Sequence, residues 1–339
     1  MAMQAESRVE PGRSEFSPEV LFGVTEEMQR IRRTLERVAS VRVPVLVRGE
    51  SGVGKEVLAG YLHRISPWRD NPLVKVNCAA IPGTLLESEL FGYEKGSFTG
   101  AYASRAGKFE IAGSGTIILD EIADIDSGLQ AKLLQVLQDG RFSRIGDLEE
   151  RHTDVRIVCI SNRQIEEEIE RGAFREDLFY RINVVSLHVP PLRERLEDLP
   201  LLVDFFLRLY SEQFRREVRP LPAAVMERLQ RHHWPGNIRE LENYLKRYVI
   251  LNEADTALED LDERSRTSAA SGLQLPRPTD FGLKKFSKLA SQQAEGYLIL
   301  EALKHTRWNR KRAAELLGIS YRALLYKMKD GGLPKKRRT

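Results

Sequence analysis

Short runs of apolar residues, many of them β-branched, recur along the first 190 positions of the chain. Most runs are continuously apolar rather than alternating, which is the pattern of strands buried on both faces. Segments with helical spacing separate them, for example Glu56–Arg64 and Gln130–Gln138. The five runs are Val43–Arg48, Leu73–Asn77, Thr116–Asp120, Val155–Ser161 and Val184–Val189. This alternation predicts an α/β fold in which a parallel five-stranded sheet lies between helices.

The pattern becomes entirely helical after Pro190 and Pro191. Apolar residues at helical spacing predict a small helical subdomain beside the sheet. Its three helices are expected at Leu199–Phe214, Ala223–Arg231 and Asn237–Leu251. The residues from Trp234 to Asn237 predict a turn, with Asn237 as the N-cap of the third helix.

A stretch without periodicity follows, and a second helical pattern ends the chain. Residues 256–288 include RSRTSAASGLQLPRPTD, whose small, polar and proline residues are typical of a linker. We therefore expect six segments: an extension at 1–20, the α/β subdomain at 21–190, the helical subdomain at 191–255, the linker at 256–288, a helical unit at 289–332 and a basic tail at 333–339.

The composition is that of a globular protein in a reducing compartment. The 339 residues are 42% hydrophobic and 30% charged, and no apolar run approaches the ~18 residues that a membrane span needs. Cys78 and Cys159 lie inside apolar runs and cannot form a disulfide framework, so a cytoplasmic protein without a membrane partner is expected. The six histidines lack ligand spacing, which argues against a structural zinc site.

Positive charge is concentrated at the carboxyl end of the chain. The overall balance is +4, but residues 305–339 contain eleven Lys/Arg and two acidic residues, a local balance of +9. A basic end on a mildly acidic body indicates that the end binds a polyanion while the body has another role. A merely solubilising tail is the alternative.

A glycine-rich loop follows the first predicted strand directly and precedes a helix. Its sequence is Gly49-Glu50-Ser51-Gly52-Val53-Gly54-Lys55-Glu56. This strand–loop–helix context is typical of a P-loop, in which backbone N–H groups and a helix N-terminus surround phosphate oxygens. Lys55 is expected to reach the β- and γ-phosphates of ATP. Glu56 replaces the Ser/Thr whose hydroxyl would ligate Mg²⁺.

Two carboxylates end the third predicted strand, about 65 residues after the P-loop. Asp120 is expected to hold Mg²⁺, through water, and Glu121 to polarise the attacking water. A strand that ends in two acidic residues is common by chance. Downstream of a P-loop, it predicts the second half of an ATP site.

These motifs resemble the AAA+ ATPase activators of sigma-54 RNA polymerase, the bacterial enhancer-binding proteins. Gly49–Glu56 is similar to that family's GESGTGKE, in which the last glutamate is also a family trait, and the resemblance extends from about Leu21 to Glu253. The most specific match is Gly96-Ser97-Phe98-Thr99-Gly100-Ala101, preceded by ESELFGYEKG. It resembles the family's GAFTGA loop, which contacts sigma-54; Ser97 stands where alanine is usual.

The resemblance also assigns roles around the nucleotide. It implies that Asn77 is a switch residue holding the catalytic glutamate, and that Ser161 and Asn162 sense the γ-phosphate. Strand-end capping is the alternative for Asn77. Arg175 and Arg181 match arginines that a neighbouring subunit supplies to the γ-phosphate.

Two further positions follow from the resemblance. Arg239, in WPGNIREL, matches the second sensor, which reaches over the nucleotide. Phe22 and Gly23, in LFGV, match a segment that lines the adenine pocket, although short apolar segments are usually core.

The final helical unit contains a predicted helix–turn–helix. Ala314 and Gly318 supply small residues at the helix contact and turn, and Ile319 and Leu324 are expected to pack the pair. The second helix, Tyr321–Lys329, is expected to enter the major groove. Candidate DNA contacts are Arg310, Lys311, Arg312, Ser320, Tyr321, Arg322 and Lys327.

This unit resembles the Fis-type DNA-binding domain of the same activators. Fis-type units pair as dimers on DNA, and Ile299, Leu300 and Leu303 are expected to supply the apolar seam. The tail residues Lys335 to Arg338 are expected to add salt-sensitive affinity.

The sequence therefore predicts an ATP-hydrolysing transcriptional activator. It implies a homo-oligomer, by resemblance a hexameric ring, that binds upstream double-stranded DNA and remodels the closed complex of sigma-54 RNA polymerase holoenzyme. Only about 20 residues precede the ATPase, so control by a regulatory protein in trans, control by expression level, and truncation of a longer chain all stay open. The rival functions are a DNA-binding repressor or activator of ordinary polymerase, whose ATPase is vestigial or only a ligand sensor, and an AAA+ chaperone or helicase.

Overall fold

The computed structural model describes residues 17–217, 220–251 and 309–330, together with residues 299, 302 and 306. The chain divides into two compact units, residues 1–258 and 259–339, which are described separately. The predicted linker at 256–288 and the basic tail at 333–339 lie outside the described residues. In the ranges described, no helix has both the length and the apolar character that a membrane span requires.

A five-stranded parallel sheet forms the centre of the first unit. In spatial order its strands are β2 (Leu73–Asn77), β5 (Thr116–Asp120), β8 (Arg156–Ser161), β1 (Val45–Arg48) and β9 (Val185–His188). All five predicted strands are confirmed, with ends that differ by no more than two residues. β8 lies in the middle, and all six of its residues are buried.

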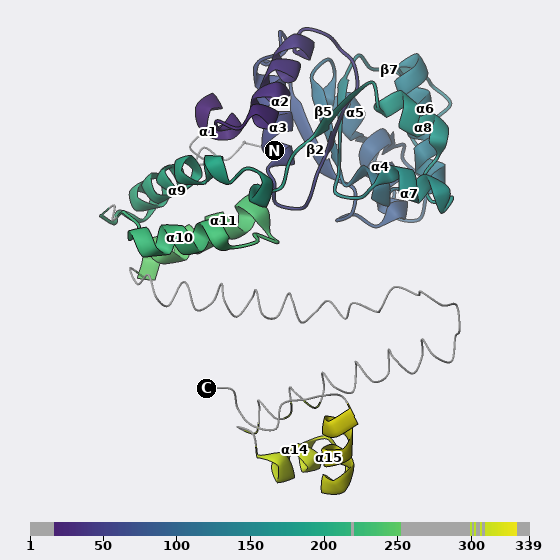
Figure 1. Ribbon diagram of the computed structural model, residues 1–339. Helices are drawn as coiled ribbons and strands as arrows, with labels where there is room; N and C mark the ends of the chain where they lie inside the picture. Colours follow the sequence, from purple (N-terminus) through teal and green to yellow (C-terminus); the bar gives the residue numbers. More distant parts are fainter. Residues whose placement is uncertain are drawn as a thin grey trace. The chain divides into compact units, whose positions relative to one another are not determined.

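Helices cover both faces of this sheet, and each face has its own apolar core (Figure 1). Neighbouring strand residues face opposite cores: Leu46 belongs to one and Val47 to the other. This explains why the strands are continuously apolar. The helices and short 3₁₀ turns of this part are α1 (Pro18–Phe22), α2 (Glu26–Val38), α3 (Lys55–Arg64), α4 (Gly83–Phe91), α5 (Lys108–Ala112), η1 (Ile122–Asp124), α6 (Ser127–Asp139), α7 (Ile165–Glu170) and α8 (Glu176–Ile182).

Two small antiparallel hairpins are inserted between these elements. The first pairs β3 (Gly92–Tyr93) with β4 (Arg105–Ala106), and the second pairs β6 (Arg141–Phe142) with β7 (Arg151–His152). The sequence pattern did not predict either hairpin. Each of these strands is two residues long, which is too short for a hydrophobic period to be recognised.

A helical subdomain follows the sheet, and we call its residues 192–251 the lid. It contains the 3₁₀ turns η2 (Leu192–Glu194) and η3 (Leu196–Asp198), followed by α9 (Leu199–Phe214), α10 (Ala223–Arg231) and α11 (Asn237–Leu251). In Figure 1 these three helices lie together beside the sheet domain. All three begin and end at the residues that the periodicity predicts.

The predicted N-cap role of Asn237 is wrong. Asn237 is itself the first residue of α11, with a left-handed φ of 52°. Its side-chain oxygen accepts from the Leu192 N–H at 2.8 Å rather than from an N–H of the first helical turn, as a cap would. Asn237 therefore connects α11 to the start of the lid.

The second unit contains a pair of helices, α14 (Arg310–Leu316) and α15 (Tyr321–Asp330). Ala314 and Leu324 are buried between them, and Gly318 has a φ of 64° in the turn, as the predicted helix–turn–helix requires. Ile299 was expected to supply part of the apolar dimer seam, but it is only 3% exposed and belongs to this core. The other two seam residues, Leu300 and Leu303, lie outside the described residues.

Candidate functional site

The P-loop connects β1 to α3 at the carboxyl edge of the sheet. Gly52 and Gly54 have φ values of 80° and 99°, which favour glycine. A Cβ at Gly52 would lie 2.4 Å from the Gly236 carbonyl oxygen, so the lid passes directly over the loop. The N-terminus of α3, a ten-residue helix, points its free N–H groups towards this loop.

Lys55 begins α3 and folds back over the P-loop. Its Nζ donates to the Gly49 and Glu50 carbonyl oxygens at 2.8 and 2.9 Å. Burial lowers the pKa of Lys55, while the nearby charges of Glu121 and Asp120 favour its protonated form. The result is a cation held inside the loop and opposite two carboxylates. The last residue of the motif, Glu56, forms an ion pair with Lys75 of β2 at 2.7 Å.

Asp120 and Glu121 lie where β5 ends, one strand away from β8 and two from β1. Asp120 accepts from the Glu121 N–H at 3.1 Å, and Glu121 accepts from the Asn162 N–H at 3.1 Å. Burial is the main cause that raises the pKa of both carboxyl groups. Glu121 has a left-handed φ of 53°, a strained conformation that is found at functional sites more often than elsewhere.

The donor set at this edge fits a magnesium ion. Mg²⁺ in nucleotide sites keeps several waters and uses one or two carboxylates together with phosphate oxygens. Asp120 offers such a carboxylate beside the P-loop, and no protein cage is required. Among the described residues, no group of three or more His, Cys, Asp or Glu side chains is arranged to hold a metal by itself.

Asn77 and Asp120 are register partners on neighbouring strands, so Asn77 lies at the site. Its side-chain oxygen accepts from the Ala80 N–H at 3.0 Å, a contact of the strand-end capping type, and its switch role stays a prediction. Glu121 accepts from the backbone N–H of Asn162. Ser161 is fully buried, and its hydroxyl exchanges hydrogen bonds with the backbone of Arg163.

Of the three predicted arginines, the structure places Arg239 on the P-loop. Its Nη1 donates to the Ser51 hydroxyl at 3.0 Å. Arg175, which precedes α8, is exposed and forms a bidentate ion pair with Asp177. Arg181, also exposed, donates to the Leu137 carbonyl oxygen at 3.1 Å. Arg175 and Arg181 are thus on the surface rather than over the P-loop of their own chain.

The Phe22–Gly23 segment is fixed against the lid. The Phe22 ring is fully buried and lies edge-on to Tyr61, so its side chain is part of the core. Gly23 has a φ of 56°, and a Cβ there would overlap the Asp198 carboxylate. That carboxylate accepts from the Val24 and Thr25 N–H groups at 2.6 and 3.1 Å. The role of Phe22 and Gly23 at adenine stays a prediction.

The Gly96–Ala101 loop is the tip of the first hairpin. Gly96 N–H donates to the Ala101 carbonyl oxygen at 2.9 Å, which closes the tip. Phe98 is 42% exposed, and its ring lies 5.0 Å from that of Tyr93. A Cβ added at Gly96 or Gly100 would meet no atom within 4 Å. The two glycines therefore have open space beside them and Phe98 is at the surface, whereas Ala101 is buried and Ser97 lies against Gly146 of the second hairpin.

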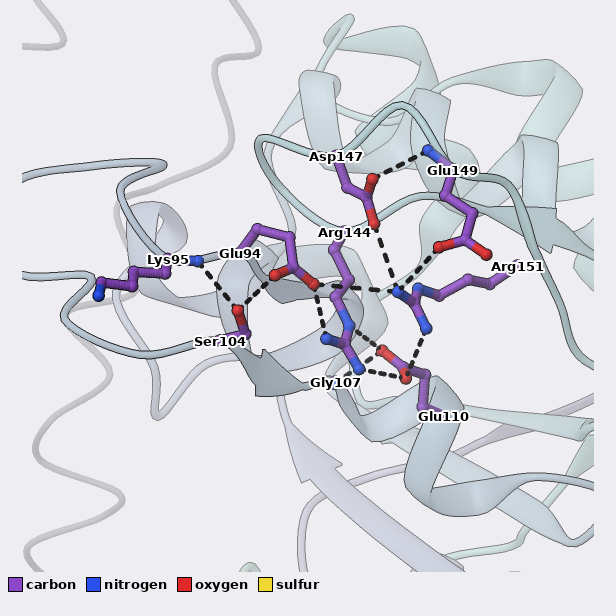
Figure 2. Close-up of polar contacts among 9 residues, drawn as sticks. All are labelled: Glu94, Lys95, Ser104, Gly107, Glu110, Arg144, Asp147, Glu149 and Arg151. Atoms are coloured by element: carbon purple, nitrogen blue, oxygen red, sulfur yellow. Dashed lines mark hydrogen bonds and ion pairs between the residues drawn. The ribbon is translucent and has the colours of Figure 1, made fainter.

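An ion network, which sequence reasoning did not find, joins the base of this loop to the second hairpin (Figure 2). Arg144 forms a bidentate pair with Glu110 at 2.7 and 2.8 Å and donates to Glu94 at 2.7 Å. Arg151 pairs with Asp147 at 3.3 Å and with Glu110 at 3.5 Å. The charges of RFSRIGDLEER in the sequence were the available signal.

Electrostatics and packing keep the two hairpins together. The Arg144 guanidinium lowers the pKa of Glu110, and the Ser104 hydroxyl and Arg144 lower that of Glu94. The carboxylates raise the pKa of Arg144 in return. The backbone continues the contact, because Glu94 N–H donates to the Ile145 carbonyl oxygen at 3.0 Å.

The basic residues described in the second unit lie at its surface. Lys311, Arg312, Tyr321 and Arg322 are exposed, and Arg310 is partly exposed. Ser320 accepts from the Ala323 N–H at 3.2 Å and so caps α15. It therefore lies at the N-terminus of α15, the end of a recognition helix that contacts base edges. The Lys327 side chain lies outside the described residues.

Comparison with known proteins gives three consecutive family matches. Residues 21–188 match the Sigma-54 interaction domain, residues 193–275 the AAA+ ATPase lid domain, and residues 292–331 the Bacterial regulatory protein, Fis family. The chain is 40% identical to the transcriptional regulatory protein FlbD of Caulobacter vibrioides, over 97% of this chain and 78% of FlbD. It is 42% identical to the nitrogen fixation protein AnfA of Azotobacter vinelandii, over 95% of this chain and 59% of AnfA.

A solved structure with the same architecture is that of NtrX from Brucella abortus in complex with ADP. It has a TM-score of 0.67 and 33% sequence identity, and the match covers 92% of this chain and 69% of that chain. The similarity to these relatives therefore extends over the P-loop sheet, the lid and the helix–turn–helix of this chain. The chain belongs to the family of sigma-54-dependent transcriptional activators, with an AAA+ domain and a Fis-type DNA-binding unit.

Proposed function

We propose that this chain hydrolyses ATP, binds upstream DNA and remodels the closed complex of sigma-54 RNA polymerase through its Gly96–Ala101 loop. The observation that carries the proposal is the position of that loop in the chain. It is inserted between β2 and β5, the two paired strands whose ends carry Asn77 and the Asp120–Glu121 carboxylates. A change at the nucleotide site can therefore reach the loop through α4 and its hairpin.

The chain's own residues supply most of the chemistry. The P-loop N–H groups and Lys55 bind the phosphates, and Arg239 contacts Ser51 of the P-loop from the lid. Glu121 orients and polarises the attacking water, and the Asn162 N–H fixes its position. Asp120 would hold Mg²⁺, which supplies neutralising charge at the phosphates when it is bound.

The exposed arginines favour catalysis at a subunit interface. Arg175 precedes α8 and Arg181 lies in it, and both side chains are exposed. They can therefore reach the γ-phosphate that is bound to a neighbouring copy. Hydrolysis would then depend on assembly, in the ring of six subunits that the family resemblance implies. The protein would work in the cytoplasm, and a separate regulatory protein could control assembly.

The basic surface of the second unit supports DNA binding. Lys311, Arg312 and Arg322 are exposed on a helix pair of helix–turn–helix type. Such a pair places the second helix in the major groove and its basic side chains on the phosphates. Tethering to upstream DNA raises the local concentration of the ATPase near its polymerase.

Open-complex formation tests the whole proposal. Purified sigma-54 polymerase, pre-bound to a promoter with an upstream site, is incubated with this protein and ATP, a non-hydrolysable analogue, or no nucleotide. Of these three conditions, only ATP is expected to allow promoter opening. A Phe98→Ala variant should retain ATPase and DNA binding but lose opening. Opening that survives in Phe98→Ala would refute the role of the loop.

The same assay separates the rival functions. ATP hydrolysis without any opening would favour a regulator of ordinary polymerase. Unfolding or unwinding of unrelated substrates by the ATPase would favour a chaperone or helicase.

A further inference from the structure

The carbonyl oxygens of the P-loop are all engaged, and the lid supplies three of the donors. Lys55 holds the first two carbonyls, those of Gly49 and Glu50. The next three accept from lid residues: Ser51 O from Asn237 Nδ2 at 3.0 Å, Gly52 O from the Arg239 N–H at 3.3 Å, and Val53 O from Arg195 Nη2 at 2.8 Å.

A carbonyl that is held in place also fixes the following N–H. The peptide unit is planar, and in its trans form the C=O and the next N–H point in opposite directions. No cis peptide bond occurs in the described residues. Contacts from the lid to the carbonyls of residues 51–53 therefore direct the N–H groups of Gly52, Val53 and Gly54 away from the lid contacts. Within the described part of the chain, none of these three N–H groups donates to a protein acceptor.

A charged contact secures the same junction. Glu50 forms a bidentate ion pair with Arg193 of η2, at 2.6 and 2.8 Å. Glu50 Oε2 also accepts from Asn237 Nδ2 at 3.1 Å. The Arg193 hydrogen bonds lower the pKa of Glu50 to about 2, so the pair is charged at neutral pH.

The lid donors are themselves held rigidly. Asn237 is fully buried, and Arg195 is only 2% exposed. Because Asn237 bridges the Leu192 N–H, Glu50 and Ser51, its amide has a single orientation that satisfies all three contacts. A lid that moved away would release the Ser51, Gly52 and Val53 carbonyls together.

We propose that Asn237, Arg195 and the Glu50–Arg193 ion pair are positioning residues for the phosphate-binding N–H groups of the P-loop. The lid thereby completes the phosphate site from outside, and affinity for a nucleoside di- or triphosphate depends on lid contact. This inference rests on the proposed function, because it takes the P-loop to be an ATP site. Since these residues contact the P-loop backbone and one another, the inference predicts an effect on phosphate binding rather than on nucleoside binding.

The test is equilibrium binding of ADP and of adenosine to the full chain. The variants are Glu50→Ala and Arg193→Ala, alone and combined, with Arg208→Ala as the matched control. Arg208 forms an ion pair with Asp204 on the exposed face of α9, in the same lid but away from the P-loop. Each single variant is expected to weaken ADP binding about tenfold, the scale of a charge-assisted hydrogen bond. The double variant should lose no more than the stronger single one.

The control and the adenosine measurement exclude a general structural effect. Arg208→Ala should bind ADP like the unchanged chain, and adenosine affinity should change less than twofold in every variant. Asn237→Gly provides a second variant, because glycine accepts the φ of 52° and removes the donor. Thermal unfolding shows whether Asn237→Gly is folded. If it is not, ADP binding by Glu50→Ala tests the inference.

Two results would overturn the inference. One is ADP affinity within twofold of the unchanged chain in Glu50→Ala and Arg193→Ala. The other is a loss of adenosine affinity as large as that of ADP. Failure of the unchanged chain to bind ADP would instead refute the proposed function, and the inference with it.

Discussion

Glu121 combines a strained backbone with a side chain that one contact holds in place. Its φ of 53° directs the side chain back across the edge of the sheet, where the Asn162 N–H donates to one carboxylate oxygen. The other oxygen is available to a water. This arrangement suits a residue that orients a nucleophile, and it separates the role of Glu121 from that of Asp120, which faces its own neighbour's N–H.

Replacement of Glu121 by glutamine should therefore affect turnover rather than binding. The amide of Glu121→Gln keeps an acceptor for the Asn162 N–H but cannot take a proton, so kcat should fall by a factor of about 10²–10⁴. Affinity for ATP should stay within threefold. Steady-state ATPase assays and ATP binding measure the two quantities. A fall in affinity that matches the fall in kcat would contradict this assignment.

Cys78 and Cys159 are buried free thiols, and we expect both to be unreactive in the native protein. Burial raises the pKa of Cys78 to about 12, and it raises that of Cys159 as well. At pH 8 both groups are therefore thiols, and only the thiolate reacts with disulfide reagents. We expect little thiol reaction in the native protein over minutes and two equivalents after denaturation. Rapid modification of one native thiol would contradict this burial.

At the scale of elements, the two inserted hairpins act as one piece. Arg144 and Arg151 connect carboxylates from the first hairpin, from α5 and from the second hairpin (Figure 2). A loop whose base is held in this way can transmit a displacement of the hairpins to its tip. The same contacts leave the nucleotide-binding edge of the sheet untouched.

Loss of Arg144 should therefore separate loop function from ATP hydrolysis. In Arg144→Ala, we expect promoter opening to fall more than tenfold while ATPase activity stays within twofold. Arg141→Ala is the matched control, because Arg141 lies in the same hairpin and forms an exposed pair with Glu150. Equal losses of opening in both variants would argue against the network, as would intact opening in Arg144→Ala.

Elements with a long apolar pattern could be predicted from the sequence, and those fixed by tertiary contacts could not. The strands and lid helices have four or more residues of recognisable period, so their existence and most of their ends were predicted correctly. The role of Asn237 was not, because Leu192 and Glu50, which it binds, are distant in sequence. An isoleucine is equally suited to a dimer interface and to a core, so the sequence alone does not distinguish the two environments. The residues that pack against Ile299 in the structure place it in the core.

The candidate site was likewise predictable where it consists of local motifs and not where it depends on tertiary contacts. The P-loop and the β5 carboxylates are local motifs, and the structure places them at one edge of the sheet. The Arg144 network depends on residues from three segments, so no local pattern contains it. The capping contact of Asn77 depends on the turn that follows β2, which the family motif does not specify.

At the scale of the whole molecule, the proposed nucleotide site and the concentration of positive charge lie in different units. The first unit contains the proposed site, and residues 305–339 have a charge balance of +9. DNA affinity should therefore fall steeply with salt, and each phosphate contact that is removed should reduce the slope of log K against log salt by about 1. Arg312→Ala and Arg322→Ala are expected to do so, and Arg208→Ala is not. Unchanged slopes in the first two would place the DNA elsewhere.

The proposed catalysis at an interface between copies makes the last prediction. If Arg181 acts on the γ-phosphate of a neighbour, Arg181→Ala and Glu121→Gln are each inactive, for different reasons. A mixture of the two contains interfaces with an intact Glu121 from one copy and an intact Arg181 from the other. ATPase activity should then reappear on mixing, to about a quarter of that of the unchanged chain if copies assort randomly and each interface acts alone. A chain that carries both substitutions should restore nothing when it is mixed with either single variant. An Arg181→Ala variant that is fully active by itself, or a mixture that stays inactive although the copies exchange, would contradict catalysis across the interface.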